Sequence, residues 1–138
     1  MTVDYQLDDR PARDELLALY ESVGWSNYTT DPDRLVAAIH GSRCVVTARI
    51  DGQLCGLARM VGDGATIAYL QDVLVAPDFQ RQGIGRSLVS TVFEKFEDVR
   101  QKVLVTDDEP RQHDFYRSLG FADFDDTAPR LHGFIKLS

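Results

Sequence analysis

The stretch of residues 73–88 most constrains what this chain can fold into. It opens with the β-branched run Val73–Val75, which is typical of a buried strand, and Pro77-Asp78 stops that strand. Two glycines, Gly83 and Gly85, follow. Apolar residues then recur at the spacing of an amphipathic helix: Ile84, Leu88, Val92 and Phe96. The pattern predicts a strand, a glycine-bearing loop and a helix in direct succession.

This succession favours the binding of a phosphate group. The start of a helix presents backbone N–H groups without intrahelical partners, and the helix dipole adds partial positive charge there. Gly83 and Gly85 carry no Cβ, so an anion can approach the backbone and either residue can adopt a positive φ. A plain turn between strand and helix is the alternative.

Two other phosphate motifs fit these residues poorly. A P-loop needs Gly-Lys-Ser/Thr, whereas Arg86-Ser87 follows the second glycine. A dinucleotide fingerprint needs a third small residue at the position that Leu88 occupies.

Two segments of the chain resemble the signatures of a known family. Residues 80–85, Gln-Arg-Gln-Gly-Ile-Gly, resemble the Gln/Arg-x-x-Gly-x-Gly/Ala loop that holds the pyrophosphate of acetyl-CoA in the GNAT superfamily of N-acetyltransferases. Residues 115–121, Phe-Tyr-Arg-Ser-Leu-Gly-Phe, look like the later Tyr-x-x-x-Gly-Phe segment of that family. Other segments are similar to small bacterial and plastid-type members. The resemblance implies one domain, residues 1–138, of the α/β (α+β) class, with a mixed, mostly antiparallel twisted sheet flanked by helices.

Composition agrees with a small globular protein. The 138 residues are 43% hydrophobic and 27% charged, and no apolar run approaches the ~20 residues of a membrane span. The N-terminus shows no signal peptide, so we expect a cytoplasmic protein. A net charge of −7 argues against nucleic acid as a partner. The acidity favours a cationic substrate such as an amine, or serves solubility alone.

Two cysteines, Cys44 and Cys55, lie in strand-like runs without a further Cys or His at metal-ligand spacing. We therefore expect packed, reduced thiols and no metal site.

The expected order of elements is ααβββαβαββ. The first helix is capped by Asp8 or Asp9 and ended by Gly24, and the second runs from Asp31-Pro32 to Gly41. Three strands follow, at residues 44–50, 53–61 and 66–75, with Asp51-Gly52 as a hairpin turn between the first two. After the helix that begins near residue 84, we expect a buried strand at 103–105, a helix capped by Asp107 or Asp108, and a final strand pair at 121–124 and 132–137.

The resemblance implies direct attack of an amine on the acetyl thioester. The sequence is compatible, because His40, His113 and His132 stand apart and no nucleophile-base pair is evident. Tyr116 stands at the family's tyrosine position, and a phenol with a pKa near ~10 suits protonation of the departing thiolate. The alternative for Tyr116 is a packed aromatic ring whose hydroxyl reaches solvent.

Asp72, just before the valine-rich run, is the candidate for handling the amine. It acts through water as a base or attracts a cationic amine; a carboxylate hydrogen-bonded to a neighbouring loop is an equal alternative. Period-2 alternation puts Tyr69 and Gln71 on the opposite face of the strand, so that one of the two sets lines the acceptor cleft.

Cofactor contacts follow from the resemblance. Main-chain groups of Val73, Leu74 and Val75 pair with the pantetheine arm like an added strand. Backbone N–H groups hold the pyrophosphate along the loop and helix start, at Arg81, Gln82, Gly83, Ile84, Gly85, Arg86 and Ser87. The two arginines add charge-assisted contacts or are simply solvated. Many relatives carry an asparagine seven residues before the tyrosine, where Glu109 stands here, and this departure leaves a contact from that position in doubt.

An aromatic cluster at Trp25 and Tyr28 is the candidate acceptor site, together with Tyr69 and Gln71. It suits an aryl-alkyl amine or a cation over a ring face, and suits equally a hydrophobic staple between helices. The expected function is acetyl transfer from acetyl-CoA to a small primary amine. A non-catalytic acyl-CoA-binding module and acetylation of a protein lysine or N-terminus are the alternatives. The family resemblance also suggests a homodimer.

Overall fold

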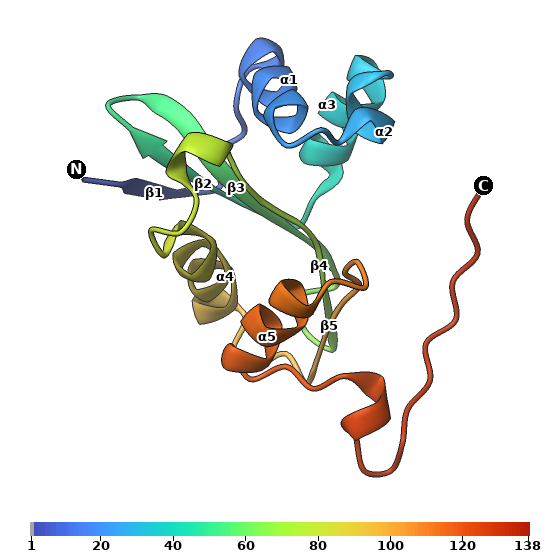
Figure 1. The fold of residues 1–138 in the computed structure, drawn as a ribbon. Helices are drawn as coiled ribbons and strands as arrows, with labels where there is room; N and C mark the ends of the chain where they lie inside the picture. Colours follow the sequence, from blue (N-terminus) through green and yellow to red (C-terminus); the bar gives the residue numbers. More distant parts are fainter. Residues whose placement is uncertain (1) are drawn as a thin grey trace. The chain divides into compact units, whose positions relative to one another are not determined.

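A computed structural model describes residues 2–138 of the chain, which divide into two compact units. The first unit ends at Leu104 and the second is Val105–Ser138. Figure 1 shows the elements of the first unit, which are β1 (Asp4–Leu7), α1 (Arg13–Ser22), α2 (Ser26–Thr29), α3 (Pro32–Gly41), β2 (Cys44–Ile50), β3 (Gln53–Gly62), β4 (Ile67–Val75), the 3-10 turn η1 (Pro77–Phe79), α4 (Ile84–Lys95) and β5 (Gln101–Leu104).

The strands form one five-stranded sheet in the order β1-β2-β3-β4-β5. Neighbouring strands are antiparallel except for β4 and β5, which are parallel. The expected mixed, mostly antiparallel sheet flanked by helices is therefore confirmed. The strand β1 was not expected from the sequence; its four residues, Asp-Tyr-Gln-Leu, alternate polar and apolar but are too few to mark a strand by themselves.

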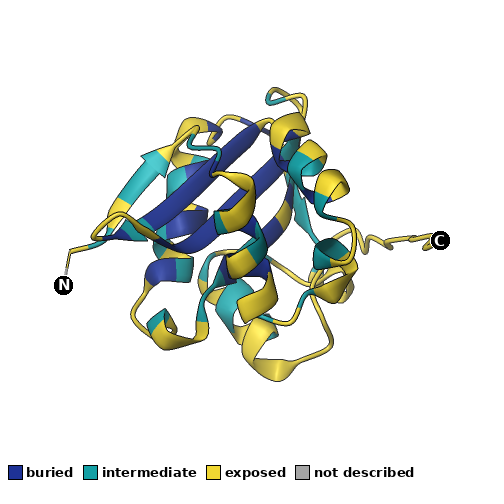
Figure 2. Cartoon of the chain, turned by 90° about the horizontal axis from the view of Figure 1, so that it is seen from above, coloured by how far each residue is buried: buried dark blue, intermediate teal, exposed yellow. Residues whose placement is uncertain are grey.

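Helices cover both faces of this sheet. One face of the sheet packs against α1 and α3 and the other against α4. Adjacent residues of β3 show this, because their side chains point to opposite faces. Leu57 belongs to the core cluster formed with α1 and α3, whereas a Cβ added to Gly56 would lie 3.1 Å from Leu88 Cδ1 of α4. Figure 2 shows the central strands as the most deeply buried part of this unit.

The first helix begins later than the sequence suggested. Its N-cap residue is Ala12, and the expected cap by Asp8 or Asp9 is wrong. Asp9 binds the strand β2 instead, since its Oδ2 accepts hydrogen bonds from Thr47 Oγ1 at 2.6 Å and from Arg49 Nε at 3.0 Å.

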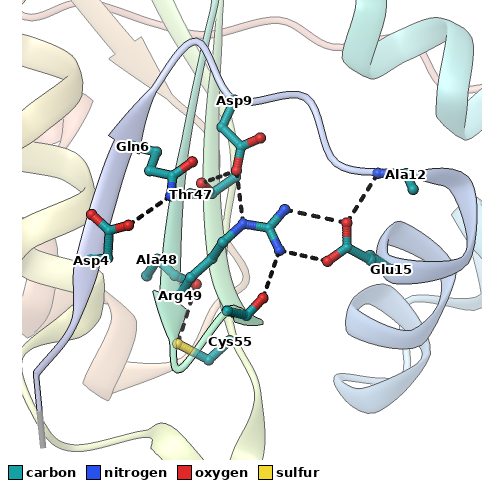
Figure 3. A network of polar contacts seen from close by, with 10 residues as sticks. Asp4, Gln6, Asp9, Ala12, Glu15, Thr47, Ala48, Arg49 and Cys55 are labelled. Carbon is teal, nitrogen blue, oxygen red and sulfur yellow. Dashed lines mark hydrogen bonds and ion pairs between the residues drawn. The ribbon is translucent and has the colours of Figure 1, made fainter.

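Arg49 of β2 anchors the start of α1 to the sheet (Figure 3). Its Nη1 and Nη2 lie 2.5 and 3.3 Å from the two carboxylate oxygens of Glu15. Glu15 in turn accepts a hydrogen bond from the backbone N–H of Ala12 at 3.2 Å. The guanidinium lowers the pKa of Glu15, so this contact is made by the ionised carboxylate.

The second predicted helix, α3, is confirmed at both ends. Asp31 caps it by accepting the N–H of Arg34 at 3.3 Å, and Pro32 opens its first turn. The short helix α2, which lies between α1 and α3 in the chain, was not expected.

The second unit contains α5 (Pro110–Ser118) and the 3-10 turn η2 (Phe124–Asp126). Glu109 is the N-cap residue of α5, so the expected cap by Asp107 or Asp108 is wrong.

The expected strand pair at 121–124 and 132–137 is also wrong, since no residue of 105–138 belongs to a strand. Apolar side chains near the C-terminal end are exposed, with 97% of the surface of Phe134 open. An apolar segment forms a strand only where another strand pairs with it, and no strand pairs with either of these two segments.

The two cysteines are free and buried, as expected. Burial raises the pKa of both thiols, and Cys55 Sγ donates to the Ala48 carbonyl at 3.3 Å. Among residues 2–138, no group of three or more His, Cys, Asp or Glu side chains is arranged to hold a metal ion. Over the same residues, no helix has both the length and the apolar character needed to cross a bilayer.

Candidate active site

The pairing of β4 with its two neighbouring strands ends at different residues. Its pairing with β3 extends to Val75, whereas its pairing with β5 ends where Leu70 meets Leu104. Within the described chain, no strand pairs with residues 71–75 on the β5 side. The main chain of β4 is therefore open to an extended ligand along this edge, up to the point where Gln80 Nε2 donates to the Val75 carbonyl at 2.9 Å.

The loop after this edge turns twice through left-handed backbone. Arg81 has φ of 64° and Gly83 has φ of 81°, and both residues are exposed. Gly83 is the N-cap residue of α4 and has no side chain to cap it. The first-turn N–H groups of α4 therefore lack a side-chain acceptor from the N-cap residue. Gly85 lies inside α4, so of the two glycines it is Gly83 that uses its conformational freedom.

The residues predicted to bind pyrophosphate, 81–87, differ in which of their groups can contact a phosphate. The Ser87 N–H donates to the Gly83 carbonyl at 3.1 Å as part of the helix, so a phosphate contact from Ser87 would come from its hydroxyl. Ile84 has a buried side chain and offers only its backbone. Arg81, Gln82 and Arg86 have exposed side chains.

Asp72 lies in a buried polar network. Its Oδ2 accepts hydrogen bonds from Arg59 Nε at 2.6 Å and from Tyr20 Oη at 3.0 Å. Its Oδ1 accepts from Tyr28 Oη at 2.8 Å. Arg59 is 6% exposed and Asp72 is 4% exposed, so the ion pair is shielded from solvent.

Sequence reasoning missed Arg59, Tyr20 and Ser42 as parts of this network. Arg59 Nη2 donates to Tyr28 Oη at 3.2 Å, and its Nη1 lies 3.4 Å from Ser42 Oγ. The available signal was Arg59 itself, a charged residue inside an apolar strand, which needs a buried partner.

A β-bulge lies beside Asp72. The register pairs Asp72 with Arg59 but Leu70 with Met60, so Gln71 has no opposite residue on β3. Such an extra residue bends the strand and reverses the alternation of its side chains beyond that point.

The bulge overturns the expected facing of Tyr69 and Gln71. Tyr69 pairs with Val61, which shares the Arg59 face of β3, so Tyr69 lies on the same face as Asp72. Gln71 Nε2 lies 3.4 Å from Tyr28 Oη, the hydroxyl that Asp72 also binds. The structure thus brings Gln71, Asp72 and Tyr28 together.

The aromatic cluster predicted at Trp25 and Tyr28 also contains Tyr20. The Tyr20 ring lies edge-on to both, with centroids 5.9 Å from Trp25 and 5.0 Å from Tyr28. Trp25 and Tyr28 are partly buried against the core beneath α1 and α3, which satisfies the hydrophobic-staple interpretation. Burial and the charge of Asp72 raise the pKa of Tyr28, so its hydroxyl stays protonated at neutral pH.

Tyr116 lies on α5 in the second unit. Its ring packs edge-on against Phe115, with centroids 5.0 Å apart, and against Phe121, with centroids 6.1 Å apart. This partial burial raises the pKa of Tyr116, so the phenol carries its proton at neutral pH.

The comparison with protein families agrees with this geometry: the family "Acetyltransferase (GNAT) family" matches residues 9–121. The chain belongs to the GNAT acetyltransferases.

A GNAT family protein, SP0256 of Streptococcus pneumoniae TIGR4, is similar in structure, with a TM-score of 0.87 and 31% identity over 99% of this chain and 98% of that one. The uncharacterized N-acetyltransferase ycf52 of Gracilaria tenuistipitata var. liui is 33% identical over 78% of this chain and 60% of that protein. The chain thus spans about three-fifths of the length of that relative. AAC(6')-Iy, solved with a bisubstrate analog, CoA-S-monomethyl-acetylneamine, shares the fold, with a TM-score of 0.74 and 14% identity over 100% and 99% of the two chains.

For a GNAT acetyltransferase, the first unit supplies two features within one sheet. One is the open β4 edge that runs into the Gly83 turn, and the other is the Asp72 network with its aromatic neighbours. Tyr116 belongs to the second unit. Glu109, where many GNAT relatives carry asparagine, is exposed at the start of α5.

Proposed function

We propose that this GNAT acetyltransferase transfers the acetyl group of acetyl-CoA to a small primary amine by direct attack. The observation that carries the proposal is the unequal pairing of β4. Its ladder with β5 ends at Leu70, its ladder with β3 continues to Val75, and the chain then enters the Gly83 turn. An extended thioester arm and a diphosphate are the groups that such an edge and such a loop accept in succession.

Acetyl-CoA binds mainly through main-chain groups in this proposal. The backbone of Val73, Leu74 and Val75 pairs with the pantetheine arm, and the loop at 81–87 holds the pyrophosphate. Arg81 and Arg86 add positive charge in a chain of net charge −7. The CoA moiety of the analog bound to AAC(6')-Iy, a protein of the same fold, supports this part of the proposal.

The reaction joins the amine nitrogen to the carbonyl carbon and breaks the carbon–sulfur bond. The amine gives up a proton to solvent water, the departing CoA thiolate takes one from the Tyr116 hydroxyl, and the resulting tyrosinate regains its proton from solvent. The Tyr116 phenol holds its proton at neutral pH, as a general acid must.

A cationic small molecule is the proposed acceptor class. The acidity of the chain favours a cation, and the rings of Trp25 and Tyr28 with the nearby Tyr69 and Gln71 offer aromatic and amide contacts. The analog bound to AAC(6')-Iy carries an acetylneamine group, and neamine is itself a small amine, which supports this class.

The test is release of free thiol from acetyl-CoA in the presence of an amine panel, with calorimetric CoA binding measured in parallel. The panel contains aryl-alkyl amines, polyamines and a lysine peptide. We expect CoA binding and turnover with a small amine. Failure to bind CoA would overturn the proposal, binding without turnover would indicate an acyl-CoA-binding module, and turnover of the peptide alone would indicate a protein acetyltransferase.

A further inference from the structure

We propose that Asp72 is a positioning residue: it fixes the Tyr28 hydroxyl, the Tyr28 hydroxyl holds the Gln71 amide, and the Gln71 amide oxygen orients the acceptor amine. The buried Asp72–Arg59 pair is the fixed support of this arrangement. This inference rests on the proposed function and deepens it, since it assigns the residues that meet the second substrate.

Most of the hydrogen-bonding capacity of the Asp72 carboxylate is used within the protein. Three donors surround it, at 2.6 Å from Arg59, 2.8 Å from Tyr28 and 3.0 Å from Tyr20. These donors occupy three of its roughly four acceptor positions, and the guanidinium compensates its charge. A general base must lie within hydrogen-bond reach of the proton that it removes. Asp72, at 4% exposure, presents no such surface to a ligand.

The titratable and charged groups that face Asp72 are the same three side chains. Tyr20 comes from α1, Tyr28 from α2 and Arg59 from β3. Tyr20 is fully buried, so the network reaches the surface through the half-buried Tyr28 and the exposed Gln71.

The orientation of Tyr28 is fixed by this support. Its hydroxyl donates to Asp72 Oδ1, and its oxygen accepts from Arg59 Nη2 at 3.2 Å and from Gln71 Nε2 at 3.4 Å. The guanidinium carbon of Arg59 also lies 5.8 Å from the centroid of the Tyr28 ring. The position of the Gln71 amide is thereby coupled to the buried ion pair.

Gln71 lies where an acceptor meets the acyl arm. It is the bulge residue, one position past the last pairing of β4 with β5 and two before Val73, the start of the edge proposed for pantetheine. With Nε2 turned to Tyr28, its Oε1 has no hydrogen-bond donor among residues 2–138. An amide oxygen accepts an N–H hydrogen bond from a primary amine and orients the nitrogen lone pair without removing a proton.

The acceptor then loses its proton to solvent water before attack. The apparent kcat/KM of the wild-type protein therefore rises with pH up to the pKa of whichever amine is used. Two amines of different pKa give two different midpoints. A midpoint that stays the same for both amines would assign the proton to a group of the protein and overturn this part of the proposal.

Four variants separate positioning from proton removal. Gln71→Ala removes the orienting amide and Tyr28→Phe removes the hydroxyl that holds it, and for each we expect about a tenfold rise in amine KM, with kcat within about threefold and CoA affinity unchanged. Tyr5→Phe removes a phenol from β1, outside the network, and should leave all three values unchanged. Asp72→Asn should show the same defect below and above the pKa of the amine. A defect that disappears above that pKa would overturn the proposal, because a base is dispensable once the amine is neutral.

A paired replacement guards against loss of folding in Asp72→Asn. The double variant Arg59→Met with Asp72→Leu removes both charges together and avoids an unpaired buried charge. It should raise the amine KM as Tyr28→Phe does. A large fall in kcat with unchanged KM in this variant would overturn the positioning role.

A readout without turnover distinguishes failure of this inference from failure of the proposed function. Asp72→Asn should lower the pH at which Tyr28 ionises, followed as tyrosinate absorbance and assigned by its loss in the Tyr28→Phe, Asp72→Asn double variant. An unshifted titration would overturn the support of Tyr28 by Asp72 whatever the activity. Absence of turnover with every amine would overturn the proposed function, and with it the acceptor contact of Gln71.

Discussion

The Asp72 carboxylate and the Arg59 guanidinium face each other between adjacent strands, with 2.6 Å from Oδ2 to Nε. Both are nine-tenths or more buried, and the tyrosines of α1 and α2 complete the hydrogen bonds of the pair. This contact links the sheet to the helices on one of its faces. It also stands next to the bulge at Gln71, where β4 leaves β5.

Replacing Asp72 by Asn should destabilise the fold by about 3–5 kcal/mol, because the Arg59 charge stays buried without its partner. Urea unfolding of both proteins measures this. The matched control is Asp33→Asn, which breaks the surface ion pair of Asp33 with Arg13. Exposed pairs contribute little, so the control should unfold near the wild-type midpoint. Equal midpoints for Asp72→Asn and Asp33→Asn would contradict the structural weight given to the buried pair.

Replacing Gly83 by Ala should weaken CoA binding by about tenfold, because a left-handed φ costs a residue with a Cβ about 1–2 kcal/mol and the loop must reshape. Calorimetric titration with CoA measures the effect. Gly41→Ala is the control, since Gly41 ends α3 and a Cβ there meets no atom within 4 Å. That variant should bind CoA normally and keep or slightly raise stability. A Gly83→Ala protein with wild-type affinity would argue against the loop geometry as the binding determinant.

Replacing Tyr116 by Phe should lower kcat by about 10²-fold while leaving CoA affinity nearly intact, because only the proton donor is removed. Steady-state thiol release and CoA titration together separate the two effects. Phe115→Leu, which alters the neighbouring ring and keeps the phenol, serves as the control. Unchanged turnover in Tyr116→Phe would remove the acid role and leave Tyr116 as a packing residue.

Stability should fall as pH rises above about 10. Burial raises the pKa of Tyr20 and Tyr28 above their ordinary value of 10.0, so the folded protein holds protons that the unfolded chain has released. Their contribution is complete below pH 10 and is lost as pH rises toward the folded pKa. Each phenol adds a slope of up to about 1.4 kcal/mol per pH unit. Urea unfolding across this range should show a shallower slope for Tyr20→Phe, and an identical slope would contradict the prediction.

Local signals predicted much of the first unit. Asp31-Pro32 marked the start of α3, Asp51-Gly52 marked the hairpin, and the residues around Gly83 marked the change from strand to helix. In each case the decisive interaction lies within a few residues of the signal. The order of the central elements followed from these signals.

Features that depend on distant partners were not predictable. Asp9 resembled a helix cap but binds Thr47 and Arg49 instead. The bulge at Gln71 exists only in relation to β3, so alternation along β4 assigned the wrong face to its side chain. The C-terminal segment at 132–137 is rich in apolar residues, as many strands are, but a strand also needs a neighbour to accept its hydrogen bonds.

Burial of Cys44 and Cys55 has a practical consequence for studying catalysis. Both thiols are closed to solvent and are held in their protonated, unreactive form. A thiol-specific dye added to the native protein should therefore meet almost no sulfur other than that of liberated coenzyme. Continuous colorimetric recording of each turnover should thus need no cysteine-free version of the chain.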